Sequence, residues 1–240
     1  MLAAAAIGLS ACAGGDAAVS RDAVNDPFEA QNRRVHAFNR GIDRALVKPS
    51  SQVYGRAVPG FLRIGITNVG NNLGLPAAVA NNVLQGRVEP AATNTLRFLV
   101  NTTFGLGGVL DPATDMGLTE RETDFGETLH VWGAAEGPYV ELPLIGPSTV
   151  RDTAGMVMGV FLDPLGAALD SPESEYVLGV RVLSTIGERY RYSDTIDSLL
   201  YQSADSYAQA RLLYLQNRRF ELGTEAEEEA YDPYEDPYAQ

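Results

Sequence analysis

Residues with the chemistry of metal, phosphate and acyl-transfer sites are few in this sequence, and their spacing does not assemble such a site. His36 and His130 are the two histidines, and His130 has no carboxylate or thiol nearby at metal-site spacing. The GLGG run at 105–108 lacks the Gly-Lys-Ser/Thr ending of a phosphate loop, and the DFG triplet at 124–126 lacks the other kinase motifs. The sequence therefore predicts no catalytic, cofactor or metal site, and a protein that is not an enzyme.

The only cysteine, Cys12, carries the most specific chemical prediction. It ends the run LSAC at 9–12, which resembles a bacterial lipobox, where the thiol receives a diacylglycerol. Several acyl chains together anchor a protein stably, whereas a single chain is marginal. The alternative is a small thiol buried in a core. We expect Cys12 to be a lipid anchor, and Ala13 after it favours the outer membrane.

The segment around Cys12 has the composition of a leader followed by a tether. The apolar run at 2–9 is too short to span a bilayer, which takes about 20 residues, and it is typical of a signal peptide. No Lys or Arg precedes it, which departs from the usual pattern. We expect a signal peptide at 1–11 and a flexible tether at 12–25.

Acidic residues dominate the charge, and they are concentrated at one end. The formal net charge is −13, and residues 221–240 contain eight acids with no Lys or Arg. A basic surface for nucleic acid is therefore not evident. The segment 223–240 is acidic and rich in proline, so we predict a disordered tail.

Apolar periodicity predicts a succession of amphipathic helices between these ends. The first is expected over 26–49, with Asp26 as N-cap, Pro27 at the first helical position, Glu29 closing a capping box and Pro49 ending the helix. A second follows Pro59, where glycines indicate a close backbone approach, a bend or a break in the helix. Further helices are expected over 76–86 and 89–105.

The second half of the sequence predicts one small extended element among further helices. Residues 105–124 read as loop, 125–133 as one or two helical turns, and 137–147 as an extended segment or hairpin. Helices are then expected from Ser148 to about 164, from Ser171 onward, and from 193 or 194 to about 220. The Asp-Pro pairs at 111 and 163 read as turn or cap residues. The predicted fold is mainly α, a single domain over 26–222 with at most a small β-hairpin.

A series of phrases along the body resembles the MlaA/VacJ family of outer-membrane lipoproteins. The resemblance covers roughly residues 26–222, and it is specific because of the order and spacing of these phrases: DPFEAQNRRVHAFNRGIDRALVKP, YGRAVP, RIGITNVGNNLGLP, NNVLQG, RFLVNTTFGLGGVLDPAT, DFGETLHVWG, GPYVELPLIGPSTVRDTAG and YLQNRRF.

Positions within these phrases match the motifs of the family. We interpret them as caps, turns and interhelical hydrogen bonds and not as substrate contacts. They are Asp26, Pro27, Asn32, Arg33, Phe38, Asn39, Lys48, Pro49, Asn72, Pro76, Gln85, Gly86, Asn101, Gly105, Gly107, Gly108, Gly126, Trp132, Gly137, Pro138, Tyr139, Pro143, Gly146, Arg151 and Asp152.

The resemblance implies a ring-shaped helical lipoprotein in the inner leaflet of the outer membrane, on its periplasmic face. It implies an amphipathic channel that removes mislocalised phospholipids from the outer leaflet and passes them to a periplasmic lipid-carrier protein. This intermembrane transfer would maintain lipid asymmetry. The implied partners are membrane phospholipids, the carrier and a trimeric outer-membrane porin. The alternatives are a structural lipoprotein that scaffolds porins or the envelope without lipid transfer, and a lipid-modifying enzyme.

Two features of the sequence are each compatible with two different environments for the helices. The apolar run at 156–162 fits a helix in the membrane interface, and it also fits an ordinary core helix. Asparagines in apolar surroundings are costly if they are buried without partners, so they either line a polar channel or bond helix ends. They include Asn68, Asn71, Asn72, Asn81, Asn82 and Asn101.

Overall fold

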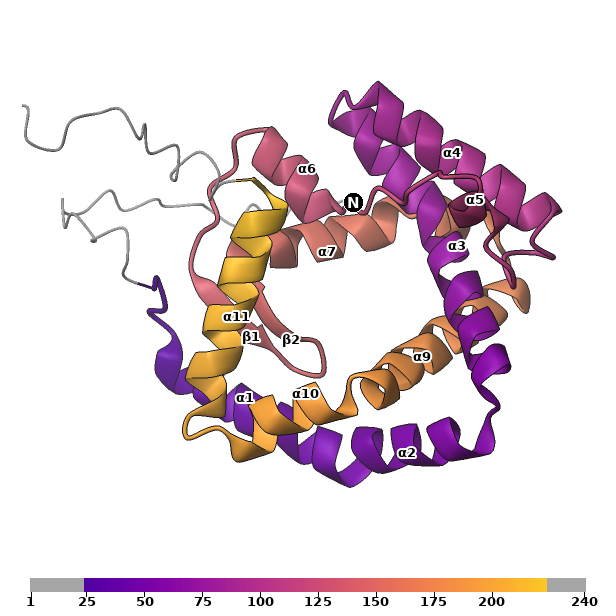
Figure 1. Cartoon of the computed structure of the whole chain (residues 1–240). Helices are drawn as coiled ribbons and strands as arrows, with labels where there is room; N and C mark the ends of the chain where they lie inside the picture. The colour runs from indigo at the N-terminus through magenta and orange to yellow at the C-terminus, as the bar shows by residue number, and fades with distance from the viewer. Residues whose placement is uncertain (1–23, 224–240) are drawn as a thin grey trace, which may run out of the picture.

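The helices form a ring around a central opening (Figure 1). The structure, a computed structural model, describes residues 24–223. Within that range the chain is mostly helical, and its only sheet is a two-stranded hairpin. The prediction of a mainly α, ring-shaped domain with a small β-hairpin is therefore confirmed. Cys12, the tether and the acidic tail lie outside the described residues.

One side of the ring is an almost continuous helical run built from three segments. They are α1 (Glu29–Ile42), the π-helical turn η1 (Asp43–Val47) and α2 (Lys48–Ala57). Pro49 was expected to end the first helix, and this is wrong. The wider turn already interrupts the regular ladder with a bond from the Lys48 N–H to the Asp43 carbonyl, so a proline that lacks an N–H follows without breaking the run.

The predicted capping box at the start of α1 is also wrong. The N-cap residue is Phe28, and no side chain caps the helix. The Asp26 carboxylate instead accepts hydrogen bonds from Asn32, Tyr207 and Arg211, so it joins the N-terminal segment to the last helix. Tertiary partners thus outcompete the local cap for this carboxylate.

The longest helix, α3 (Gly60–Leu84), is continuous where the sequence predicted two helices. Pro76 lies inside it. Two of its glycines are positions of close approach, one of the three alternatives: a Cβ on Gly70 would lie 2.5 Å from Ser184 Oγ of α9, and one on Gly65 would lie 3.1 Å from Val109. Packing against neighbouring elements therefore keeps the helix intact despite the low propensity of its glycines.

The helix α4 (Val88–Thr103) packs on α3, and a loop with one short helix follows it. That helix, α5 (Pro112–Asp115), and α6 (Phe125–Val131) match the predicted loop and helical turns. Asp111 caps α5 by accepting from the Thr114 N–H, and Asp163 caps α8 (Pro164–Ala168), as predicted for the two Asp-Pro pairs.

The hairpin pairs β1 (Tyr139–Leu142) with β2 (Gly146–Thr149) in antiparallel register, with Tyr139 opposite Thr149. It leads directly into α7 (Val150–Leu162). The expected N-cap of this helix, Ser148, is wrong, since Ser148 belongs to the strand and its hydroxyl meets Thr153. Thr149 is the cap, and its Oγ1 accepts from the Asp152 N–H at 3.2 Å.

The C-terminal side contains more breaks than the sequence predicted. The helix α9 (Glu173–Arg191) starts as expected, but the single last helix is divided into α10 (Ser193–Asp197), the π-helical turn η2 (Ser198–Gln202) and α11 (Ser206–Glu221). The backbone is extended at Ser203, and Asp205 caps α11 by accepting from the Ala208 N–H. After this break, α11 runs along one side of the ring, beside the hairpin (Figure 1).

The wall of the ring has a thin apolar core and a large exposed apolar surface. Its main buried apolar cluster consists of Tyr139, Tyr207 and Leu215. Val160 and Phe161 of α7 are each 76% exposed, so the run at 156–162 is not an ordinary core helix. Exposed apolar surface on this scale indicates contact with another apolar phase or partner. Among residues 24–223, no helix combines the length and apolar character needed to cross a bilayer.

Candidate functional site

The interior of the ring contains two adjoining hollows. One, of about 690 Å³, is lined by residues of α3, α7, α9 and α11, and the other, of about 520 Å³, by residues of α1, the hairpin, η2 and α11. Both are lined by Pro147, Tyr214 and Asn217, so they adjoin, and we call the two together the central hollow. Helices from opposite sides of the opening line it, which places it inside the ring (Figure 1).

Most of the wall of the central hollow is apolar. In the larger part, α3 and α7 contribute small and aliphatic side chains, and in the smaller part the hairpin tip, η2 and α11 do so. These residues are Ala77, Ala80, Leu84, Met156, Gly159, Val160, Leu162, Leu144, Ile145, Leu199, Leu200 and Leu213.

A charged cluster interrupts this apolar wall. Arg218 of α11 contacts the Asp124 carboxylate at 2.7 Å and the Asp152 carboxylate at 3.2 Å, and the Tyr214 hydroxyl donates to Asp152 at 2.8 Å. Burial alone would raise the pKa of Asp152, but the Arg218 charge and the hydrogen bonds of Arg218 and Tyr214 outweigh it and lower the pKa. The Nε of Arg218 has no acceptor. A second pair, Arg181 with Asp163 at 3.0 Å, lines the same part of the hollow.

The smaller part contains a buried polar network around His36. Its Nδ1 lies 3.2 Å from Glu141 Oε1 and its Nε2 lies 3.0 Å from Ser206 Oγ. The Tyr139 hydroxyl donates to the other oxygen of Glu141, and burial together with this carboxylate raises the pKa of Tyr139. The network links α1, the hairpin and α11. Across the described residues, no group of three or more His, Cys, Asp or Glu side chains is placed to hold a metal ion.

The motif residues near the N-terminus connect α1 to the hairpin and to the C-terminal helices. Asn32 accepts from the Glu141 N–H at 3.0 Å, and Asn39 accepts from the Leu144 N–H at 2.7 Å. Arg33 pairs with Asp205, and Lys48 pairs with Asp197 at 2.7 Å.

The motif residues of the middle segment bond α3 to α4, and both helices to the segment that follows α4. Asn72 donates to Thr102 Oγ1, Gln85 donates to the hydroxyls of Thr123 and Thr128, and Asn101 donates to Asp111 Oδ1. Gly108 has a φ of +93°, and a Cβ there would lie 2.7 Å from the Asn72 side chain. Trp132 Nε1 donates to the Leu84 carbonyl at 3.1 Å. Most of these side chains therefore lie within the wall of the ring.

Three of the motif residues border the central hollow: Asn39, Gly146 and Asp152. The phrase YLQNRRF at 214–220 contains Tyr214, Asn217 and Arg218, but sequence reasoning gave none of the three a place in a site. Their spacing of three and four residues, continued to Glu221, places them on one face of α11, and this was the available signal. The partners of Arg218 come from segments 94 and 66 residues away, which no local pattern indicates.

A helical ring around an amphipathic hollow, with many exposed apolar side chains, defines a class of ring-shaped proteins suited to amphipathic ligands. A model described as MlaA lipoprotein matches residues 24–221. The chain belongs to the MlaA lipoprotein family, which confirms the resemblance found in the sequence.

Several known proteins are similar to this chain. The intermembrane phospholipid transport system lipoprotein MlaA of Escherichia coli K12 is 35% identical over 82% of this chain and 78% of its own length. The protein of the same description from Haemophilus influenzae is 29% identical over 90% of this chain and 87% of its own. A solved structure from work on the structural basis for maintenance of bacterial outer membrane lipid asymmetry matches with a TM-score of 0.71. It is 32% identical and covers 82% of this chain and 98% of that one.

Proposed function

We propose that this protein is an outer-membrane lipoprotein that removes mislocalised phospholipids from the outer leaflet through its central hollow. It passes them to a periplasmic carrier and so maintains lipid asymmetry. The observation that carries the proposal is the pair of adjoining hollows inside the ring, with an apolar wall interrupted by the Arg218 cluster. The family relationship and the named activity of the relatives support it.

The wall of the central hollow matches the two parts of a phospholipid. Acyl chains gain from contact with the aliphatic side chains of α3 and α7, because apolar area is removed from water. The phosphate would meet Arg218, whose Nε lacks an acceptor, and Arg181 across the hollow. Asp152 and Asp124 offset part of this positive charge, so the headgroup is held weakly enough to leave. Such passage requires no bond to be made or broken.

The test blocks the hollow without disturbing the wall. A Cβ on Gly159 has no heavy atom within 4 Å, and this residue lines the hollow, so Gly159→Trp should fill the space. Gly41→Trp is the matched control, since a Cβ on Gly41 also meets no heavy atom within 4 Å, and Gly41 is an exposed residue of α1 outside both hollows. In a deletion strain, we expect Gly41→Trp but not Gly159→Trp to restore a low level of phospholipid accessible to added phospholipase.

The second candidate, a scaffold for porins without lipid transfer, rests on the exposed apolar exterior. It predicts that deletion disturbs porin assemblies while lipid asymmetry stays normal. It also predicts that Gly159→Trp restores these assemblies fully in the deletion strain. Under the leading proposal, the same exterior faces the inner leaflet and a trimeric porin.

Cys12 would be the acylated anchor, and Cys12→Ala should abolish acyl labelling and release part of the protein from the membrane.

A further inference from the structure

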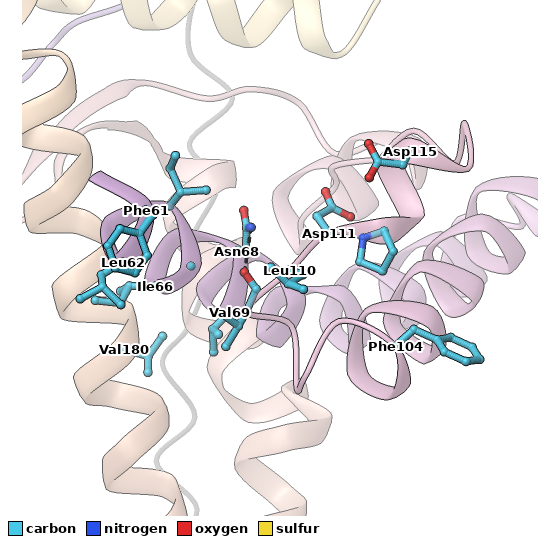
Figure 2. Close-up of a pocket in the computed structure, with 14 residues that line it drawn as sticks. Phe61, Leu62, Ile66, Asn68, Val69, Phe104, Leu110, Asp111, Asp115 and Val180 are labelled. Atoms are coloured by element: carbon cyan, nitrogen blue, oxygen red, sulfur yellow. Dashed lines mark hydrogen bonds between the residues drawn. The ribbon is translucent and has the colours of Figure 1, made fainter. Parts of the chain in front are cut away.

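A second apolar hollow lies along α3 and shares no lining residue with the central hollow. It has a volume of about 680 Å³, and it is bordered by the first half of α3, by the loop that follows α4 and by Val180 of α9 (Figure 2). Phe61 and Ile64 on its wall are 72% and 63% exposed. The remaining apolar lining is Leu62, Ile66, Val69, Phe104, Val109, Leu110 and Pro112.

A cationic hollow of about 720 Å³ adjoins the apolar one, and the two share Ile64 and Asn68. Arg63 and Arg191 both line it, and Glu188 is the one acid in its lining, so the arginines outnumber the acids. The Arg63 guanidinium lies 4.9 Å from the centre of the Tyr190 ring, which holds it in place, and its Nε is buried without an acceptor. We call the two hollows together the α3 groove; it shares no lining residue with the central hollow.

The charge state of this groove distinguishes it from the central hollow. Arg218 and Arg181 there are each paired with a carboxylate, whereas neither Arg63 nor Arg191 has one within 4.0 Å among residues 24–223. A buried guanidinium N–H without an acceptor is costly unless a ligand supplies one. An anionic group that enters the groove would therefore complete an unsatisfied site.

We propose that the α3 groove binds one phospholipid outside the ring opening, with its phosphate on Arg63 and Arg191 and an acyl chain in the apolar hollow. The shape fits this occupant, because a cationic end and an apolar end meet at Ile64. The balance of charge fixes the orientation, because two arginines and one acid line the cationic hollow, whereas two acids and no Lys or Arg line the apolar one. Asp111 and Asp115 lie at the end of the apolar hollow away from Phe61 (Figure 2), so they repel a phosphate there. An apolar protein helix would leave both arginines without an acceptor.

The experiment uses the full chain incorporated into vesicles of phosphatidylglycerol that contain a diazirine on one acyl chain. After irradiation, the labelled residues are located by mass spectrometry. We expect labelling of residues 60–69 in α3 and, if the proposed function holds, of α7 in the central hollow. Arg63→Gln should reduce α3 labelling about tenfold, as loss of a charge-assisted hydrogen bond to phosphate predicts. It should leave α7 labelling unchanged.

Controls separate the groove from folding and from the central hollow. Arg56→Gln removes an exposed arginine of α2 and should change neither label. Arg191→Gln is the second variant if Arg63→Gln does not fold, and it should also lower α3 labelling selectively. The proposal is overturned if α3 is not labelled in the wild type, if neither variant lowers its label, or if a photoreactive residue at Phe61 captures a protein in cells in place of lipid. Loss of α7 labelling alone would count against the proposed function and not against the groove.

Discussion

Arg189 of α9 donates to both oxygens of Asp43, from Nε to Oδ1 at 2.8 Å and from Nη2 to Oδ2 at 2.9 Å. The two residues are 146 positions apart, so the pair closes the ring between its first and last parts. Asp197 and the Tyr201 hydroxyl complete the cluster. Burial alone would raise the pKa of Asp43, but Arg189 and Tyr201 reverse the effect and lower it.

Replacing Arg189 should therefore destabilise the ring. Arg189→Met leaves the Asp43 carboxylate mostly buried beside Asp197, and we expect a loss of about 3 kcal/mol in the free energy of unfolding. The loss is measured as a lower urea midpoint in detergent solution, with Arg56→Gln as a surface control. A midpoint equal to that of the wild type would show that the pair does not hold the ring closed.

The start of α11 should respond to acid. Arg33 donates to both oxygens of Asp205, and this ion pair, with the Ala208 N–H, lowers the pKa of Asp205 to about 2 from 3.8. Because the folded-state pKa is the lower one, the stabilisation is fully present above pH 3.8 and is lost as the pH falls through about 2. The effect should be small, since the two side chains are 41% and 45% exposed.

The measurement compares urea midpoints at pH 4 and pH 2. Asp205→Asn should lose less stability over this range than the wild type, because it has no proton to take up at this position. Asp194→Asn, at an exposed position in α10, serves as the control and should follow the wild type. Parallel loss in all three proteins would argue against a contribution from Asp205.

Two glycines of α7 should respond in opposite directions to alanine. A Cβ on Gly155 would collide with the backbone of Gly126 where α6 crosses α7, whereas a Cβ on Gly159 meets nothing within 4 Å. Gly155→Ala should cost about 2 kcal/mol through overpacking. Gly159→Ala should stabilise the helix by about 0.5–1 kcal/mol. Thermal melting of the two variants provides the comparison, and equal shifts would mean that the helix crossing is looser than the structure has it.

Asn32 should be required to hold the hairpin on α1. Its Nδ2 donates to Asp26 and to the Tyr139 carbonyl, and its Oδ1 accepts from the Glu141 N–H. Asn32→Ala removes the side-chain acceptor of the buried Glu141 N–H and one donor to the Tyr139 carbonyl, while Asp26 keeps Tyr207 and Arg211, and we expect a loss of about 2 kcal/mol. Gln31→Ala, at an exposed neighbouring position, is the control. Amide hydrogen exchange at Glu141 should accelerate in the first variant only.

Local patterns in the sequence were enough to predict most helices and the hairpin, because each carries its own periodicity or turn residues. These patterns failed where contacts with residues far away in the sequence determine the local structure. Asp26 has the residue type of an N-cap, yet its carboxylate accepts hydrogen bonds from Asn32, Tyr207 and Arg211. The glycines of α3 left a close approach, a bend and a break open, and only the position of Ser184, more than 100 residues later, shows that Gly70 marks a close approach.

The central hollow was not predictable residue by residue for the same reason. The face of α11 that lines it is visible in the spacing of Tyr214, Asn217 and Arg218, but nothing local distinguishes this face from one that packs on a core. Its character depends on α3 and α7 lying opposite, which is a property of the closed ring. The resemblance to the family anticipated the ring itself.

Ring closure through pairs as distant as Asp26 and Arg211 has a consequence for how the polypeptide is made. These residues are 185 positions apart, so closure must wait until nearly the whole chain has emerged from the ribosome or the export channel. Folding through such non-local pairing is slow. Until the ring closes, the apolar faces of its helices are exposed to water. A chaperone that binds these faces would therefore determine how much of the newly made polypeptide reaches the closed ring.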